Sequence, residues 1–473
     1  LYLTKYGEKI TKIPDKETVT NLSKSKNVDE KLIAAFLIGK NYDNSYYINL
    51  KLLLRDLNQE VKIAAIKAIS KNKLTEFCPA IIDYLDTPGV YSFANDALVN
   101  MGKDSLVHLD QAFYKTGTTQ HVLLRIVKII GTIGGQKATE ILLRKLDHPN
   151  SEVVNEILVQ LKANNYKAGE DSINQIHQIL DQHLGIMAWN IAAIATLKDQ
   201  PKFEYLKKAF DDELKSNYDR MYLLLSLAYD TKSIMHVKEN LESGTSEGAS
   251  FALELLELFI YEEIKPKLFP VVEDISIIEK IKQLQNFYPI EKLPLTDFLI
   301  AVINRDINNI SLWTKSCALY AFSELENFSI TNDIIAHLYN PNDILRQTAA
   351  YSIITNEKDF LNTINYRLEN KYKDEFEQLF TEENNFRFNL LIEKVFFLKE
   401  NIHFKNTNGN SLMILAKSLQ MFNLDLYDDN KFNVSSIKNL ILFVRSGDLT
   451  IKSEDFKITL NEHSIFTISD YNE

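Results

Sequence analysis

A short turn sequence recurs along this chain at intervals close to 31 residues, and it restricts the possible folds more than any other feature. In each copy a Leu precedes a few polar residues, after which a new apolar pattern begins. The copies lie at residues 54–61, 85–90, 146–153 and 338–344. The second copy starts 31 residues after the first and the third starts 61 residues later, so a copy without the Leu-Asp pair is expected near 113–117. A repeat of this length cannot bury both of its faces alone, so it stacks on its neighbours.

Each interval holds two patterns in which apolar residues recur three and four positions apart, which places them on one side of a helix. The short polar breaks make consecutive helices antiparallel. After each turn we expect an Asn or Ser to cap the next helix, with an acidic residue facing the positive helix end. The helices expected up to residue 200 span 60–70, 76–85, 90–101, 106–114, 121–133, 137–146, 152–161 and 173–180.

The composition agrees with a helical chain, because only 14 of the 473 residues are Gly and 10 are Pro. Typical proteins contain about 7% Gly and 5% Pro. Both residue types are concentrated in turns and bends of the backbone. This scarcity excludes a large β-sandwich, a collagen-like chain and a Gly/Pro-rich disordered chain. We expect regular repeats over residues 1–200 and irregular helical repeats over 201–380. The helices expected in the second part span 203–210, 220–228, 251–259, 277–284, 297–302, 312–322 and 344–354.

The pattern changes in the last part of the chain, residues 381–473. Two helices are expected at 390–399 and 411–420. A β-rich run follows at 440–445, and after it come short segments in which apolar and polar residues alternate. These segments predict a small antiparallel β unit. The expected strands span 440–445, 449–452, 456–460 and 465–468.

Residues 58–70 with Asp56, and their echo at 150–161, resemble HEAT repeats of the bacterial kind. The resemblance is clear over about residues 50–200 and weaker as far as 370. It implies a mainly α fold, a HEAT-like α-solenoid of antiparallel helix pairs with long concave binding surfaces.

The last 80 residues are similar to a cyclic-nucleotide-binding domain. Residues 393–404 look like its lead-in helix, and the Ser446-Gly447 turn within 442–449 looks like a hairpin of its β-roll. In that family a Gly and a Glu follow the Phe that corresponds to Phe466, whereas here Thr467 and Ile468 follow it, and the sequence ends at Glu473 before an Arg-bearing segment. We therefore expect a small, incomplete roll with Gly447, Phe466, Thr467 and Ile468 as degenerate landmarks. It would bind no cyclic nucleotide, because a buried phosphate without donors is poorly compensated.

No residue pattern points to catalysis, a metal or another cofactor. His177 and His183 are six residues apart, which places them on different sides of a helix, and no HExxH motif occurs. Residues 131–139 contain three glycines and a Lys, but Gln136 and Ala138 flank the Lys where a phosphate-binding loop needs Gly and Ser or Thr. We expect a helix–helix turn there. Cys78 and Cys317 are expected to be buried small hydrophobes, and we predict that the chain is no enzyme.

The net charge of −11 and the absence of a basic stripe argue against nucleic-acid binding. No run of 18 apolar residues occurs, so we expect no membrane span in these residues. Because the chain begins at Leu1, we expect a piece of a longer protein, tethered through an upstream membrane segment.

Helical repeats followed by such a roll resemble the part outside the membrane of bacterial ADP/ATP-carrier-type transporter fusions. The resemblance implies a cytoplasmic, non-catalytic scaffold, placed at the inner face of the membrane, that binds a protein of unknown identity. One alternative is a stand-alone HEAT adaptor that binds another protein. A HEAT-like DNA-binding repair enzyme ranks last, because that fold binds DNA on a basic concave face.

Overall fold

The computed structural model describes residues 15–325, 328–358, 360, 363, 367–380, 389–420, 440–452 and 457–468. These residues are mainly helical, with a small pair of two-stranded antiparallel sheets near the end of the sequence, as predicted. The chain divides into two compact units. Unit 1 contains residues 1–183 and 219–273, and unit 2 contains residues 184–218 and 274–473.

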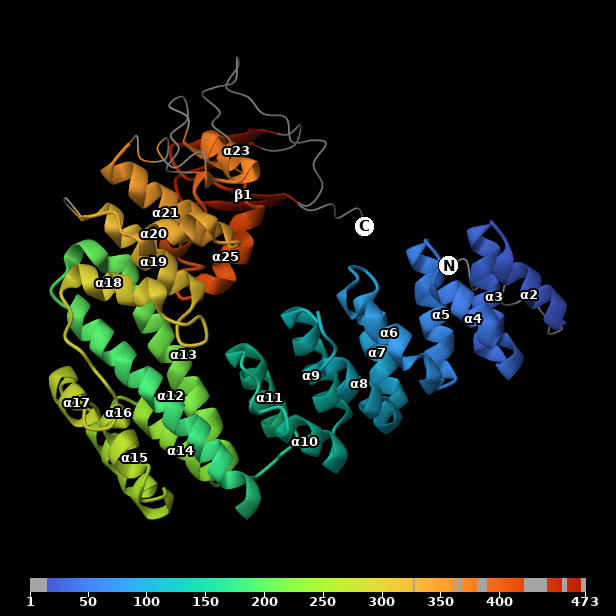
Figure 1. Ribbon diagram of the computed structural model, residues 1–473, viewed down its shortest axis with the longest axis horizontal. Helices are drawn as coiled ribbons and strands as arrows, with labels where there is room; N and C mark the ends of the chain where they lie inside the picture. Colours follow the sequence, from blue (N-terminus) through green and yellow to red (C-terminus); the bar gives the residue numbers. More distant parts are fainter. Residues whose placement is uncertain are drawn as a thin grey trace. The chain divides into compact units, whose positions relative to one another are not determined.

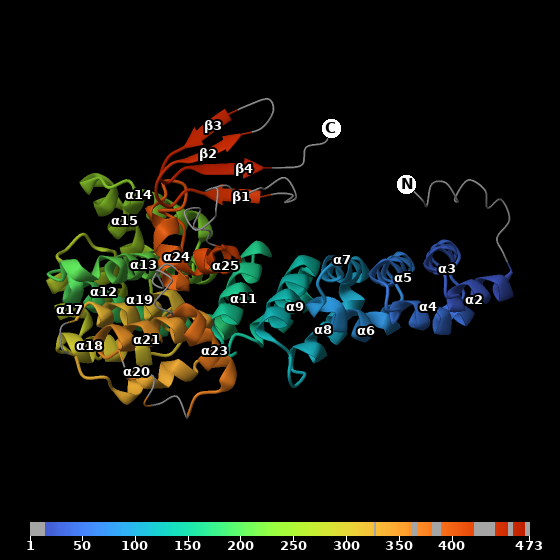
Figure 2. The same ribbon diagram turned by 90° about the horizontal axis from the view of Figure 1, so that it is seen from above.

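The first half of unit 1 is built from two rows of helices. In the stacked row each helix contacts the next, and each also contacts the partner-row helix that precedes it in sequence. The stacked row consists of α3 (Val28–Lys40), α5 (Gln59–Lys71), α7 (Tyr91–Met101), α9 (Gln120–Ile133) and α11 (Ser151–Ala163). The partner row consists of α2 (Lys16–Lys24), α4 (Tyr47–Leu54), α6 (Cys78–Ile82), α8 (Leu106–Phe113) and α10 (Gly135–Leu143). Figure 2 shows the stacked row along one side and α4, α6 and α8 along the other.

Asparagine caps start several helices of the stacked row, which confirms the prediction for the turns at 54–61 and 146–153. The Asn58 side chain accepts hydrogen bonds from the backbone N–H groups of Glu60 and Val61, at 2.9 and 3.2 Å. Asn150 caps α11 in the same way. The turn at 85–90 is different, because no side chain caps α7 and Gly89 makes the turn with φ +77°.

The helix expected at 76–85 is broken into three short pieces. These are η2 (Thr75–Phe77), α6 and η3 (Asp83–Asp86). Pro79 stands at the start of α6, where its missing N–H cannot close a bond to a preceding helical turn. The other short 3₁₀ segments are η1 (Asn44–Tyr46), η4 (Gly102–Ser105), η5 (Pro201–Phe203) and η6 (His337–Tyr339).

Two long helices follow the rows, and both are longer than the sequence pattern suggested. α12 (Glu170–Leu197) continues well beyond the expected end at residue 180, and α13 (Glu204–Ala228) joins two expected helices into one. Residues 184–197 of α12 are apolar on almost every side, and residues 211–219 of α13 are mostly polar, so neither stretch has a visible helical period. Unit 1 is completed by α14 (Thr231–Glu242), α15 (Ser246–Phe259) and α16 (Lys265–Val272).

Unit 2 is organised around α19 (Leu312–Ser323), which is buried on all sides from Trp313 to Phe322. α19 packs against α21 (Asp343–Asn356), and α21 packs against α24 (Leu391–Glu400), so these helices share one core. Among the described residues, the unit also contains α17 (Ile277–Leu284), α18 (Leu295–Asn304), α20 (Asn332–Ala336), α23 (Asn370–Leu379) and α25 (Gly409–Ser418), all labelled in Figure 1. The core therefore uses residues from both sides of position 380.

Four strands form two antiparallel pairs. β1 (Leu440–Phe443) pairs with β4 (Ile465–Ile468), and β2 (Leu449–Lys452) pairs with β3 (Lys457–Leu460), as Figure 2 shows. The small antiparallel β unit is thus confirmed. The expected hairpin at Ser446-Gly447 is not, because this turn leads from β1 in one sheet to β2 in the other. The composition of the strands agrees with this pairing. The two paired strands Leu440–Phe443 and Ile465–Ile468 are both strongly apolar, whereas β2 and β3 each alternate apolar and polar residues.

Candidate functional site

Each helix of the stacked row exposes one residue at an equivalent position. These residues, which we call the ridge, are each exposed next to at least one buried residue of the same helix, and Phe36, Lys67 and Lys128 have buried neighbours on both sides. Along the chain they are separated by 31, 29, 32 and 31 residues. The ridge consists of Phe36, Lys67, Asp96, Lys128 and Val159. Five successive helices therefore present the same position to solvent, with a spacing equal to that of the turns.

The chemistry of the ridge is mixed. Phe36 and Val159 are each 40% exposed, whereas the other three positions carry two cations and one carboxylate. Lys67 Nζ lies 4.8 Å from the ring centre of Phe93 in the next helix of the row. Lys128 Nζ lies 3.8 Å from the Glu156 carboxylate, and this pair has small energetic value because the distance is long and Lys128 is exposed.

Asparagine side chains join neighbouring helices of the row at their C-terminal ends. Asn72 Nδ2 donates to the Gly39 carbonyl at 3.2 Å, and Asn164 Nδ2 donates to the Gly131 carbonyl at 2.9 Å. Asn100 bonds the Ser70 carbonyl at 3.0 Å. Each bond joins residues 30 to 33 positions apart and supplies a donor to a carbonyl near a helix end, where no intrahelical partner is available. These bonds fix the stacking distance of the ridge.

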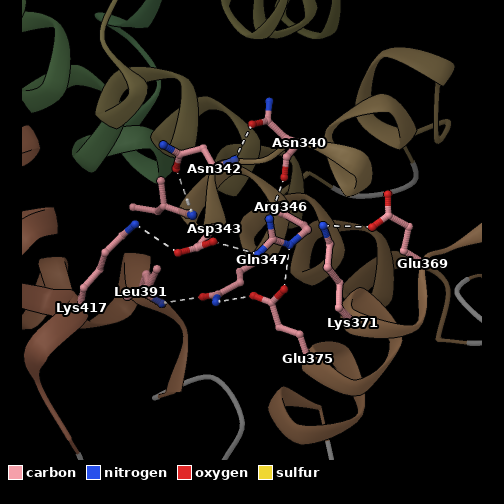
Figure 3. Close-up of polar contacts among 11 residues, drawn as sticks. Asn340, Asn342, Asp343, Arg346, Gln347, Glu369, Lys371, Glu375, Leu391 and Lys417 are labelled. Carbon is pink, nitrogen blue, oxygen red and sulfur yellow. Dashed lines mark hydrogen bonds and ion pairs between the residues drawn. The ribbon is translucent and has the colours of Figure 1, made fainter. Parts of the chain in front are cut away.

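A second polar cluster lies in unit 2 at the start of α21, and Figure 3 shows its residues. The Arg346 side chain is only 6% exposed, and its guanidinium donates to Glu375 and to Asp343, at 2.7 and 2.9 Å. A third bond reaches the Asn340 carbonyl at 2.7 Å. Gln347 Nε2 donates to Glu375 at 2.8 Å, and the amide oxygen of Gln347 accepts from the backbone of α24. The cluster therefore joins α21 to α23 and α24.

A small cavity of about 210 Å³ lies beside this cluster, between the start of α21 and one side of α25. Its apolar lining includes Ile344, Leu391 and Met413, and Lys417 at its rim pairs with Asp343 at 3.1 Å. None of its described lining residues is a His, Cys, Ser, Asp or Glu. Because its cation is already paired, this cavity offers shape and apolar contact rather than acid–base chemistry.

The histidines singled out in the sequence lie on α12 and have local partners. His177 Nε2 lies 3.0 Å from the Tyr229 hydroxyl, and the ring stacks on Tyr261 with centres 5.6 Å apart. Burial lowers the pKa of His177, against a smaller opposing effect of the Glu263 charge. Over the described part of the chain, no group of three or more His, Cys, Asp or Glu side chains is arranged to hold a metal ion.

The glycines of 131–139 pack helices together. Gly131 lies inside α9, with the Gln160 side chain of α11 in the space that a Cβ atom would need. Gly134 and Gly135 turn the chain into α10 with φ of +65° and +83°. The helix–helix turn is confirmed. Cys78 and Cys317 are both buried, as predicted, and burial raises the pKa of the Cys78 thiol to about 11.

The four landmarks named from the sequence lie in one turn and in β4. Gly447 lies in the turn after β1 with φ +76°. Phe466, Thr467 and Ile468 lie in β4, with Leu442, Ile441 and Leu440 of β1 as their Cα partners. Three of the four landmarks are therefore part of a paired strand.

A scan against protein-family models and a search of the curated proteins found no match for this chain. In the parts of the chain that the structure describes, no helix has both the length and the apolar character needed to cross a bilayer.

The ridge was not singled out from the sequence, although Lys67 and Lys128, which are 61 positions apart, each stand between two pairs of apolar residues. At α3 the signal is hidden, because the exposed Phe36 is itself apolar.

Proposed function

We propose that this chain is a HEAT-like α-solenoid that acts as a non-catalytic protein-interaction scaffold. The observation that carries this proposal is the recurrence of one exposed position in five stacked helices at intervals of 29 to 32 residues. Stacked repeats of this kind present extended surfaces on which a partner can contact many repeats at once.

The chemistry of the ridge supports a protein as the partner. A nucleic-acid surface needs clustered Lys and Arg side chains that neutralise phosphates. The ridge alternates aromatic, cationic, acidic and aliphatic positions, and the whole chain carries a net charge of −11. Protein surfaces match such mixed chemistry through apolar contacts at the centre and charged pairs at the rim.

A photo-crosslinking experiment tests the scaffold. A photoreactive phenylalanine analogue is placed at Phe36 or Val159 in the native cell, with Lys137 on α10 as a matched exposed control in the partner row. A discrete protein adduct from both ridge positions and none from residue 137 is the expected result. Adducts to nucleic acid, or equal protein adducts from all three positions, would contradict the proposal.

The C-terminal roll serves in this proposal as a structural element without a ligand. Thr467 and Ile468 support this role, because both belong to a paired strand and neither side chain can replace a Glu that holds a ribose hydroxyl. Calorimetric titration of the full chain with cyclic AMP or cyclic GMP should give no saturable heat. Micromolar binding of either nucleotide would overturn this part of the proposal.

From the resemblance to transporter fusions, we also propose that the chain is a cytoplasmic region associated with a bacterial nucleotide-transporter-like membrane protein. The reading frame upstream of residue 1 tests this directly. About a dozen apolar spans of roughly 20 residues each in the same frame would agree with it. A frame without such spans would instead favour the stand-alone adaptor.

A further inference from the structure

The most acidic segment of unit 1 surrounds helix α15. Residues 239–264 contain seven Glu and neither Lys nor Arg, although the whole chain holds 53 Lys and Arg residues. The same segment is rich in Leu and also contains two Phe residues. A helix that combines dense negative charge with large apolar side chains is suited to a contact in which both are matched.

One side of α15 is buried and the opposite side is exposed. Gly248, Ala252 and Leu256, spaced four residues apart, are buried where the helix packs on α14, its neighbour in Figure 1. On the other side Phe251 is 53% exposed and Leu258 is 82% exposed. A Leu with 82% exposure has lost almost none of its apolar surface to folding, so this side of α15 has no partner in the described structure.

The exposed side has the spacing of a helix-pairing seam. Glu247, Phe251, Glu254 and Leu258 follow one another at intervals of four, three and four residues, the 3.5-residue period of paired helices. Acidic and apolar positions alternate along this seam. With the described residues Glu247 and Glu254 form no ion pair, whereas Glu257 and Glu262 at its edge are both held by Lys265, at 3.0 and 2.6 Å. Two carboxylates of the seam are thus available to a partner.

We propose that this seam of α15 is a docking site for a basic amphipathic helix of another protein. The inference rests on the proposed scaffold function and names the chemical class of one partner. The helix would place apolar side chains against Phe251 and Leu258 and Lys or Arg side chains against Glu247 and Glu254. Recognition of an amphipathic helix through anchors three, four and seven residues apart follows this geometry.

Charge selects this occupant over others. Nucleic acid and anionic membranes are repelled by the seven glutamates of the segment. A symmetric pair formed by two copies of this seam would supply no cation to Glu247 or Glu254, so the carboxylates would lie against each other or against apolar side chains, which opposes association. A basic helix is attracted over the same surface, and the attraction weakens as salt is added.

The probe that tests the site is a fluorescein-labelled synthetic helix of about 20 residues, with Leu at alternating intervals of three and four and Lys on both flanks. A control peptide of the same length carries Glu in place of every Lys. Fluorescence anisotropy with the full chain should show saturable binding of the Lys peptide, weakened by salt, and no binding of the Glu peptide. Equal binding of both peptides, or of neither, would overturn the proposal.

Variants locate the site. The double variant F251S/L258S should weaken binding of the Lys peptide at least tenfold, which is about 1.4 kcal/mol. The double variant E247K/E254K should lose the Lys peptide and gain the Glu peptide. Ile48→Ser on α4 removes an equally exposed apolar residue, 74% exposed, and should leave binding unchanged. Circular dichroism melts confirm that each variant is folded. Binding that survives F251S/L258S, or a self-association of the chain abolished by that variant, would overturn the assignment.

Failure of this site and failure of the scaffold are separable. The crosslinking positions at Phe36 and Val159 lie on the stacked row, and the peptide assay reads α15 alone. Ridge adducts without peptide binding would reject only the α15 site. Peptide binding without ridge adducts would retain the α15 site and reject the proposed use of the ridge.

Discussion

Arg346 is the residue in unit 2 whose loss should cost most stability. Its guanidinium joins Glu375, Asp343 and the Asn340 carbonyl and lies 4.4 Å from the ring centre of Tyr372. Removing one partner of a buried pair leaves the other charge uncompensated. We expect R346A to lower the free energy of unfolding by about 3 kcal/mol. R346K should recover only part of that loss, because a lysine ammonium cannot reproduce the planar guanidinium that bonds three separate acceptors.

Urea denaturation followed by circular dichroism measures the effect of R346A. Lys417→Ala is the matched control, since Lys417 belongs to the same cluster but is 51% exposed. The control should change the free energy of unfolding by less than about 0.5 kcal/mol. An equal loss in both variants would show that the cluster is not organised around Arg346.

His337 makes the stability of unit 2 depend on pH. Burial lowers the pKa of His337, the nearby Lys315 charge lowers it further, and the Ile303 carbonyl and Asp333 partly oppose the shift. Because the pKa is lower in the folded state than in the unfolded state, the unfolded state binds the proton first as pH falls. The contribution of neutral His337 to the free energy of unfolding is therefore fully present above about pH 6.5 and decreases below it.

The midpoint of urea denaturation, measured at several pH values between about 7.5 and 5.5, tests this dependence around the ordinary histidine pKa. In the wild type the midpoint should fall with pH, and in His337→Gln the fall should be smaller. His177 contributes in the same direction, so the double variant with His177→Gln should flatten the profile further. A midpoint that rises as pH falls would contradict the sign.

At the scale of helices, α9 and α11 of the stacked row pack tightly at Gly131. The Gln160 side chain occupies the space that a Cβ would need, so Gly131→Ala forces the two helices apart. Overpacking of this kind costs about 1 to 3 kcal/mol. Gly169→Ala is a matched control, because no atom lies within 4 Å of its Cβ position. Thermal melts should show the loss only in the first variant, and a stabilised Gly131→Ala would show that the row relaxes freely.

The helices that the sequence predicts best are those whose start is capped by a side chain, here Asn58, Ser276 and Asn342. The helix expected at 277–284 is α17 with the same limits, and α5 and α21 differ from expectation by one or two residues at each end. Periodicity could not reveal the second half of α12, where Leu184, Met187 and Ala188 are all buried and polar residues are rare. It could not reveal Arg346 either, because the partner Glu375 is 29 residues away.

At the scale of the whole molecule, the cores do not follow the changes in composition. The sequence suggests boundaries at 200 and 380, whereas the core of unit 2 combines Phe210 of α13 with Leu319 of α19 and Phe396 of α24. The Tyr205 and Phe396 rings stack with centres 3.7 Å apart. Such pairings between distant segments depend on shape, which composition and periodicity do not encode. Strands β2 and β3, in contrast, were visible because alternation is a local property.

The stacked row should unfold repeat by repeat and not as one block, because the stability of each repeat depends on its own helices and on its interfaces with neighbouring repeats. α9 contacts stacked helices on both sides, whereas α2 lies at one end of the described rows. If stability is a sum of repeat and interface contributions, amides of α9 open less often than amides of α2. Hydrogen exchange should show protection in α9 at least tenfold above that in α2, and Gly131→Ala should reduce protection in α9 and α11 before it affects α3. Equal protection throughout the row, lowered everywhere by that substitution, would indicate all-or-none unfolding and would contradict the solenoid proposal at its physical basis.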